Sequence, residues 1–302
     1  MGLNLSGMTT ETRNPRTMQL DQMSPLEIVT VMNEEDARVP LAIAKCLPQI
    51  AQAVTWAAES FEKGGRLFYM GAGTSGRLGV LDAAECPPTF GVPKEMVVGL
   101  IAGGEKAFIE AVEGAEDSWE LAVEVLKAHG LTANDLVVGI AASGRTPYVL
   151  GGLDYAKSVG CHTAAIACNI GSAIGKAAEL AIEVNCGPEV LTGSTRLKSG
   201  TAQKLILNMI STGSMVRTGK AYQNLMVDVQ QTNEKLHTRA ENIVIDATGV
   251  AREKARAALD AAGGSVKTAI TMLLADCDAK EAARRLEKAR GHVREAIRLE
   301  VL

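Results

Sequence analysis

The stretch from Arg66 to Gly79 constrains the fold of this chain more than any other. Its apolar run, Leu67 to Met70, has the length of a buried β-strand and leads into a loop of glycine and hydroxyl residues. The glycines of this loop permit a tight turn and close approach of a ligand to the backbone. A helix that begins there offers free N–H groups and its positive dipole end to an anion, with Thr74 and Ser75 as further donors.

The glycine spacing of this loop also occurs in dinucleotide-binding folds, which place an acidic residue at the end of the next strand. Here the next apolar run, Met96 to Ile101, ends in Ala102, Gly103 and Gly104 instead. Hydroxyl groups in the loop suit one compact phosphate. The sequence therefore predicts a phosphate site at Gly73, Thr74 and Ser75, with a purely structural turn as the alternative.

A second unit of strand, hydroxyl loop and helix follows at Leu136–Ala142, where Ser143 and Thr146 precede a proline suited to a first helical turn. These two hydroxyls are predicted to bind phosphate or to cap the helix. Further apolar runs lie at 163–167 and 180–184. Strands that alternate with helices indicate an α/β fold, a parallel sheet with helices on both faces that binds its ligand at the carboxyl ends of the strands.

The two ends of the chain are predicted to be helical. Residues 1–20 are expected to form a polar arm, disordered or laid over a neighbour, before a short helix to Asn33 and a longer one over 39–62 that Pro48 kinks or splits. A helix of about 20 residues starts near Lys198, and another spans 226–245. The stretches 252–261, 266–274 and 279–299 predict a three-helix, UBA-like module. The expected domains are residues 1–246 and 247–302.

Composition excludes several classes of function. A net charge of −4 and 3% aromatic residues disfavour nucleic-acid binding. The six cysteines form no C-x-x-C pair or zinc-ligand spacing and are typical of a reducing compartment, so no metal is expected. Neither a signal-peptide core nor a run of 18 apolar residues is found, which predicts a soluble cytoplasmic protein with no membrane partner.

Two hydroxyl loops on a parallel sheet, at 73–76 and 143–146, resemble the sugar isomerase (SIS) domain, which binds phosphosugars. Longer motifs narrow the resemblance. Stretches over nearly the whole chain are similar to the N-acetylmuramic acid 6-phosphate etherases, namely Gly71–Gly79, Asp82–Thr89, Ala111–Asp117, Thr192–Lys204 and Asn224–Asp228.

This resemblance implies a cofactor-free lyase of peptidoglycan recycling. It would convert N-acetylmuramic acid 6-phosphate and water to N-acetylglucosamine 6-phosphate and D-lactate, by β-elimination from the open-chain sugar and addition of water to the alkene. The family's motif glutamates match Glu85 and Glu116. A non-catalytic phosphosugar-binding regulator and a phosphosugar isomerase are the alternatives, and a regulator would need the hydroxyl loops alone.

The chemistry requires carboxyl groups that exchange protons near neutral pH. Pro87 and Pro88 are expected to stop the helix so that Glu85 lies in its last turn, where the negative dipole end makes a carboxylate a better base. Glu113 and Glu116 are neighbours on one face if their segment is helical, and the resemblance alone selects Glu116. The sequence does not decide which glutamate is base and which is acid.

Further candidate residues lie elsewhere in the chain. Ser194 and Lys198 are possible phosphate ligands, and Arg77 and Arg145 offer guanidinium groups that could equally make structural ion pairs. His237 is expected on a polar helix, as a surface residue or as the proton shuttle of ring opening, which a partner subunit's histidine performs in some SIS enzymes. SIS sheets of this kind usually pair, so the resemblance implies a homodimer with its site near the subunit interface, and the helix over 39–62 and the polar arm could supply the contact.

Overall fold

The computed structural model describes residues 7–110, 112–229 and 234–299 of the chain. The chain divides into two compact units. The first comprises Met1–Ala84 and Glu95–Ser211, and the second comprises Glu85–Lys94 and Thr212–Leu302. Two helices have residues in both units, and the predicted domains 1–246 and 247–302 stay a prediction.

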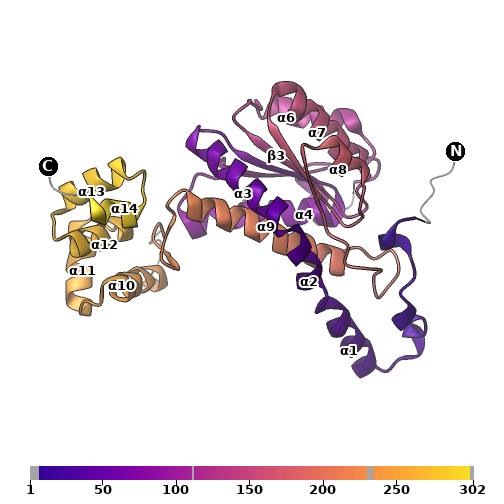
Figure 1. Ribbon diagram of the computed structural model, residues 1–302, viewed down its shortest axis with the longest axis horizontal. Coiled ribbons are helices and arrows are strands. Elements are labelled where there is room, and N and C mark those ends of the chain that lie inside the picture. Colours follow the sequence, from indigo (N-terminus) through magenta and orange to yellow (C-terminus); the bar gives the residue numbers. More distant parts are fainter. Residues whose placement is uncertain (1–6, 111, 230–233, 300–302) are drawn as a thin grey trace. The chain divides into compact units, whose positions relative to one another are not determined.

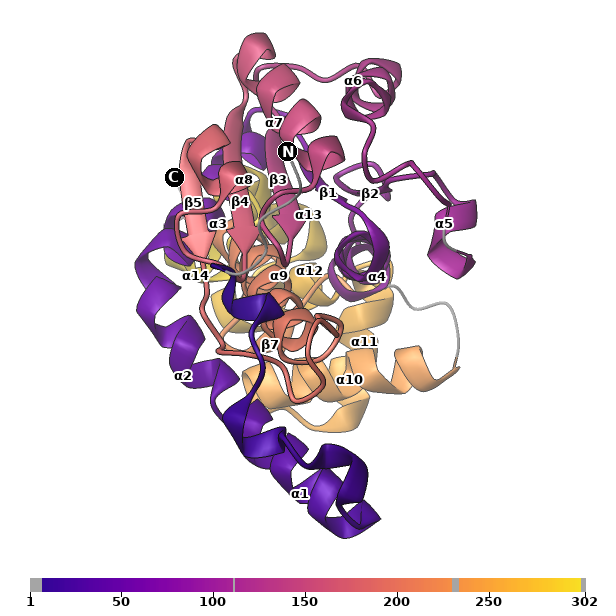
Figure 2. The same ribbon diagram turned by 90° about the vertical axis from the view of Figure 1, so that its right-hand side faces the viewer.

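The first unit is built on a five-stranded sheet with the strand order β2-β1-β3-β4-β5 (Figure 2). Every neighbouring pair is parallel, and Gly71 pairs with Ile101 on one side and Ile140 on the other. The predicted parallel sheet is confirmed. The strands are β1 (Leu67–Gly71), β2 (Val97–Ile101), β3 (Leu136–Ala141), β4 (His162–Ala167) and β5 (Leu180–Glu183).

Helices cover both faces of this sheet (Figure 1). Alternate residues of a strand point to opposite faces. Phe68 and Met70 therefore enter a core with α6, α7 and α8, whereas Tyr69 faces α4 and α9 and its hydroxyl donates to the Leu207 carbonyl at 3.5 Å. The helices are α1 (Pro25–Asp36), α2 (Val39–Ile43), α3 (Leu47–Glu62), α4 (Gly73–Phe90), α5 (Lys106–Ile109), α6 (Trp119–Ala128), α7 (Pro147–Val159), α8 (Ala173–Ala177) and α9 (Lys198–Arg217).

The end predicted for α4 is wrong. The helix continues through Pro87 and Pro88 to Phe90, where the Gly91 N–H still bonds to the Pro87 carbonyl at 2.9 Å. Each proline removes one N–H donor, but the chain keeps helical geometry past both of them. Glu85 thus lies five residues before the end of α4 and outside its last turn.

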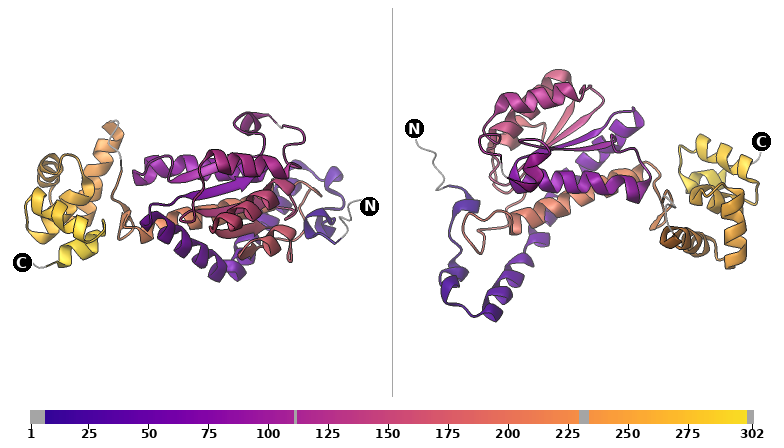
Figure 3. Two further views of the ribbon diagram at one scale, coloured as in Figure 1. Left: turned by 90° about the horizontal axis from the view of Figure 1, so that it is seen from above. Right: turned by 180° about the vertical axis from the view of Figure 1, so that it is seen from behind.

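The N-terminal segment packs on its own chain. Residues 1–6 lie outside the described part, and from the carboxyl edge of the sheet the chain runs beside α1 to the start of that helix (Figure 3). The Thr10 hydroxyl accepts a hydrogen bond from Asn169 at 3.0 Å, and Thr17 donates to the Val190 carbonyl at 2.8 Å. The predicted split at Pro48 is confirmed, since α2 ends at Ile43 and α3 starts at Leu47.

The second unit contains a helical bundle with its own core, in which Val244, Leu259 and Ile270 are buried. The predicted helix over 226–245 begins only at Glu234, although residues 230–233 lie outside the described part. The third predicted helix, 279–299, is two helices, because Arg290 and Gly291 adopt left-handed φ angles of 50° and 82°. The elements are β6 (Ala221–Tyr222), β7 (Leu225–Met226), α10 (Glu234–Thr248), α11 (Arg252–Ala261), α12 (Val266–Ala275), α13 (Ala279–Lys288) and α14 (Val293–Arg298).

Among the helices of the described residues, none has both the length and the apolar composition needed to cross a membrane.

Candidate functional site

The first hydroxyl loop joins β1 to α4 at the carboxyl edge of the sheet. A Cβ atom at Gly76 would lie 2.6 Å from the Gly71 carbonyl oxygen, so these two glycines allow the strand and the helix to touch. Gly73 has a φ of 51° and faces open space. As the first residues of the helix, Gly73, Thr74 and Ser75 have N–H groups without acceptors inside it. The predicted anion-binding geometry is therefore present here.

Ser75 is anchored from α9. Its hydroxyl donates to Gln203 Oε1 at 3.0 Å, and both side chains are buried. Thr74 is half-buried, and a Cβ atom at Gly200 of α9 would lie 3.6 Å from its methyl group. The start of α4 is thus set by contacts with α9 as well as by the sheet.

The second hydroxyl loop lies beside the first, because β3 is the neighbour of β1. Asn169, which follows β4, donates to the carbonyls of Ala142 and Ser143, at 3.3 Å in each case. The half-buried Ser143 hydroxyl accepts from the Arg145 N–H at 3.3 Å. The structure therefore brings Ser143 to the same edge as Gly73, Thr74 and Ser75.

Glu116 is joined to this second loop. The buried Thr146 donates its hydroxyl to Glu116 Oε1 at 3.1 Å, and the Tyr148 N–H at the start of α7 donates to the Glu116 carbonyl at 3.0 Å. Thr146 occupies the N-cap position but makes no side-chain cap bond, so the capping interpretation is wrong for it. The helical interpretation of 113–116 is also wrong, since α5 ends at Ile109 and these residues form turns around Gly114, whose φ is 75°.

Glu85 is exposed on α4, in the second unit. Because it lies outside the last helical turn, the helix dipole gives little of the assistance that the sequence predicted. The catalytic role of Glu85 therefore stays a prediction that rests on the etherase motif.

Lys198 is a structural residue in this arrangement. Its ammonium group donates to Glu35 Oε2 at 2.6 Å and to the Cys186 carbonyl at 3.0 Å, and both charged side chains are 1% exposed. Burial would raise the pKa of Glu35, but hydrogen bonds from Lys198, Arg16 and Asn14 outweigh it and lower that pKa to about 2. This buried pair supports a structural role for Lys198, and its contact with the phosphate stays a prediction.

The remaining candidates are dispersed. Ser194 is half-buried in the loop before α9, and His237 is exposed on α10 in the second unit. Arg77 donates to the carbonyls of Ala107 and Phe108 at 2.9 and 2.7 Å, and these hydrogen bonds support a structural role. The Arg145 guanidinium reaches Met8 Sδ at 3.6 Å.

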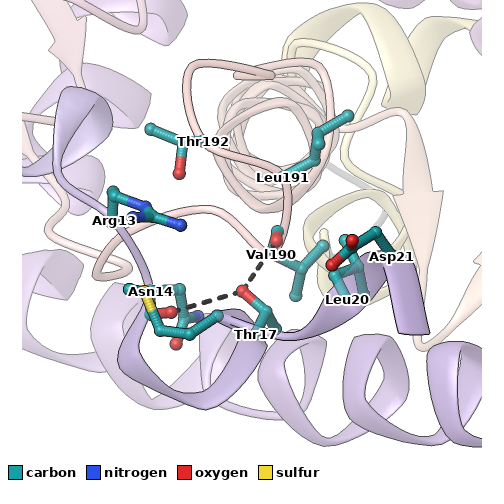
Figure 4. A pocket seen from close by; sticks show the side chains of 9 residues that line it. Arg13, Asn14, Thr17, Leu20, Asp21, Val190, Leu191 and Thr192 are labelled. Carbon is teal, nitrogen blue, oxygen red and sulfur yellow. Dashed lines mark hydrogen bonds between the residues drawn. The ribbon is translucent and has the colours of Figure 1, made fainter. Parts of the chain in front are cut away.

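A pocket of about 380 Å³ lies between the N-terminal segment and residues 190–192 (Figure 4). Arg13, Asp21 and Thr192 are among its lining residues, and the Thr17 hydroxyl closes one side by its bond to Val190. None of the predicted site residues lines this pocket.

Sequence reasoning missed three residues that hold the loops. Asn169 follows a predicted strand, so its place in the chain was a usable signal, because every such loop meets the same edge of the sheet. Thr10 and Gln203 gave no comparable signal. They reach the loops from an arm and from the middle of a helix that only the tertiary fold brings near.

Comparison with known proteins supports the fold. The chain matches the family model "Glucokinase regulatory protein N-terminal SIS domain" over residues 49–157 and the model "SIS domain" over residues 120–212. A Bacteroides fragilis structure of a candidate phosphosugar isomerase involved in capsule formation is 20% identical, with a TM-score of 0.50 over 67% of this chain and 95% of that chain. This likeness supports the fold alone.

Two curated relatives extend over almost the entire chain. An N-acetylmuramic acid 6-phosphate etherase of an Exiguobacterium species is 62% identical over 293 residues, which cover 97% of this chain and 100% of the relative. The protein of the same name from Serratia proteamaculans is 61% identical over 295 residues, covering 98% and 99%.

Proposed function

The chain belongs to the family of N-acetylmuramic acid 6-phosphate etherases, and we propose that Glu116 carries a proton in its reaction. The protein is a carbon–oxygen lyase that cleaves the D-lactyl ether of N-acetylmuramic acid 6-phosphate. The products are N-acetylglucosamine 6-phosphate and D-lactate, and the reaction belongs to the recycling of cell-wall sugars.

The reaction couples proton transfers to the cleavage of the C3–O bond and to the addition of water at C3. A base removes the proton at C2 of the open-chain aldehyde, and the electron pair forms the C2=C3 double bond as the C3–O bond breaks. Lactate leaves with the ether oxygen and gains a proton. Water then adds to C3, and C2 regains a proton. A carboxylate that changes its protonation state can serve these steps.

The Thr146–Glu116 hydrogen bond is the observation that supports Glu116. It links the carboxylate to the hydroxyl loop, while the Tyr148 N–H holds its backbone. A hydroxyl has one proton to donate, so we assign Thr146 to orienting Glu116. The phosphate is assigned to Gly73, Thr74, Ser75 and Ser143, with Ser194 as a further proposed contact. Glu85 is proposed as the second proton carrier on its motif.

The oxygen balance provides a test of this chemistry. In water enriched in ¹⁸O, elimination and readdition place the label at C3 of N-acetylglucosamine 6-phosphate and leave the lactate hydroxyl unlabelled. We expect Glu85→Gln and Glu116→Gln to bind the substrate and to lose lactate release. Label in the lactate hydroxyl would refute elimination, and an unchanged turnover in either variant would remove that glutamate from the mechanism.

We also propose that the chain acts as a cytoplasmic homodimer in which the partner subunit's His237 serves ring opening. All six cysteines are free thiols, as a reducing compartment maintains them. Leu26 and Val29 on one face of α1 and Leu41 on α2 are exposed apolar residues suited to a subunit contact. Mixing inactive Glu116→Gln and His237→Ala subunits should restore activity if the site is shared. A monomer at micromolar concentration would contradict this proposal.

A further inference from the structure

We propose that Gln203 is a positioning residue that makes the Ser75 hydroxyl a hydrogen-bond donor to the substrate phosphate. This rests on the proposed phosphate site at the start of α4. Ser75 is the third residue of that helix, and Gln203 reaches it from α9. Gln203 is fully buried at 0% exposure, so its carboxamide lies in a fixed polar contact beside the anion site.

In the structure, Ser75 is the hydrogen-bond donor of this pair. The single hydroxyl proton of Ser75 points to Gln203 Oε1 at 3.0 Å, so it is directed away from a bound anion. The Gln203 Nε2 atom is buried and has no hydrogen-bond partner among the described residues. A buried N–H donor without a partner is costly and uncommon, so the amide has a reason to change its orientation.

A 180° rotation of the carboxamide exchanges Nε2 and Oε1 with little change in shape. Nε2 then donates to Ser75 Oγ, and the hydroxyl proton is released toward the positive end of α4. Two hydrogen bonds then run in series, from Nε2–H to Oγ and from Oγ–H to a phosphate oxygen. They strengthen each other because each bond polarises the next. The oxygen atom that replaces Nε2 is a buried acceptor, which proteins tolerate better than an orphaned N–H.

The starts of α4 and α9, which carry Ser75 and Gln203, are each fixed by contacts that do not involve this pair. The buried Glu189 carboxylate accepts from the N–H groups of Lys198 and Ser199, at 2.9 Å in each case, and so fixes the start of α9. The contact between Gly71 and Gly76 fixes the start of α4. A substitution at Gln203 should therefore change the direction of the hydroxyl more than the position of either helix.

The test is a double-mutant cycle on phosphate affinity. Gln203→Met keeps the size of the side chain and removes the amide. We expect it to weaken binding of N-acetylglucosamine 6-phosphate and of inorganic phosphate about threefold, because the Ser75 hydroxyl is retained but loses the donor that orients and polarises it. KM should rise similarly, while kcat falls less than twofold. In a Ser75→Ala background, Gln203→Met should cause no further loss.

Asn208→Leu is the matched control. Asn208 Nδ2 donates to Asp82 Oδ1 at 2.7 Å and joins the same two helices further along. Its loss should lower the Tm but leave phosphate affinity unchanged. Gln203→Glu is a second variant, because a carboxylate cannot donate to Ser75 and repels phosphate. It should lose affinity even if Gln203→Met does not fold.

Three results would overturn the role of Gln203: wild-type phosphate affinity in folded Gln203→Met or Gln203→Glu, equal losses with and without the Ser75 hydroxyl, or an equal loss in Asn208→Leu. Calorimetry measures phosphosugar binding without turnover, so the result for Gln203 can be told apart from a failure of the proposed lyase function. A chain that binds the phosphosugar but releases no lactate would refute only the proposed lyase mechanism.

Discussion

The buried pair of Lys198 and Glu35 gives the most specific energetic prediction. Removing one partner of a buried ion pair costs about 3–5 kcal/mol, because the other charge is left without compensation. The two single variants should differ. Without Lys198, Glu35 keeps Arg16 at 2.9 Å and Asn14 at 3.0 Å, whereas without Glu35 the ammonium keeps the Cys186 carbonyl at 3.0 Å. Lys198→Met should therefore cost about 3 kcal/mol and Glu35→Met nearer 5.

Urea unfolding followed by tryptophan fluorescence measures this difference, since both tryptophans, Trp56 and Trp119, belong to the first unit. The double variant should recover part of the loss, because apolar side chains replace both charges. Costs below about 1 kcal/mol for both single variants would refute the buried pair. A Lys198→Met variant of full stability that no longer binds phosphosugar would instead make Lys198 a phosphate ligand.

The same pair predicts the response to acid. Its partners lower the pKa of Glu35 from 4.5 to about 2, so the unfolded chain binds the proton more readily. The stabilisation is present above pH 4.5 and is lost as the pH falls through about 2. It amounts to about 3 kcal/mol, and Glu35→Met should lack this part of the pH dependence. An identical acid profile in the two proteins would contradict the assignment.

Three further substitutions test the loops. Thr146→Val removes the hydroxyl that holds Glu116, so kcat for lactate release should fall about tenfold with a small change in Tm. An unchanged kcat would count against the orienting role of Thr146. Gly144→Ala should lower both Tm and activity, because Gly144 has a φ of 74° and a Cβ atom there would lie 2.4 Å from the Cβ of Ser172. An unchanged Tm would refute this packing. Asn169→Ala should release the N-terminal segment and speed its limited proteolysis, whereas wild-type protection would show that this bond is unimportant.

The fold was largely predictable because its signals are local. Each strand of the sheet is a short apolar run bounded by turn residues, and Phe68 and Met70 alternate with Tyr69 between the faces as a period of two requires. The helix through Pro87 and Pro88 was missed because the sequence argues for a stop there. The break at Gly291 was missed because the surrounding residues continue a helical pattern.

The position of the hydroxyl loops was predictable from the sequence, and the residues that support these loops were less so. Gly73, Thr74, Ser75 and Ser143 follow strands directly, so the topology of a parallel sheet places them together. The partner of a buried charge cannot be read from local sequence, so the pair of Lys198 and Glu35 was not predicted. The bond between Glu116 and Thr146 likewise depends on tertiary packing.

The central claim is that Glu116, held at the second hydroxyl loop, carries a proton in ether cleavage. Its most direct test is the rate of D-lactate release from N-acetylmuramic acid 6-phosphate by Glu116→Gln, with Glu113→Gln as the control from the same exposed turn. We predict a loss of about 100-fold or more for Glu116→Gln, as for a general acid–base residue, and a rate near wild type for Glu113→Gln. Equal rates in the two variants would contradict the claim.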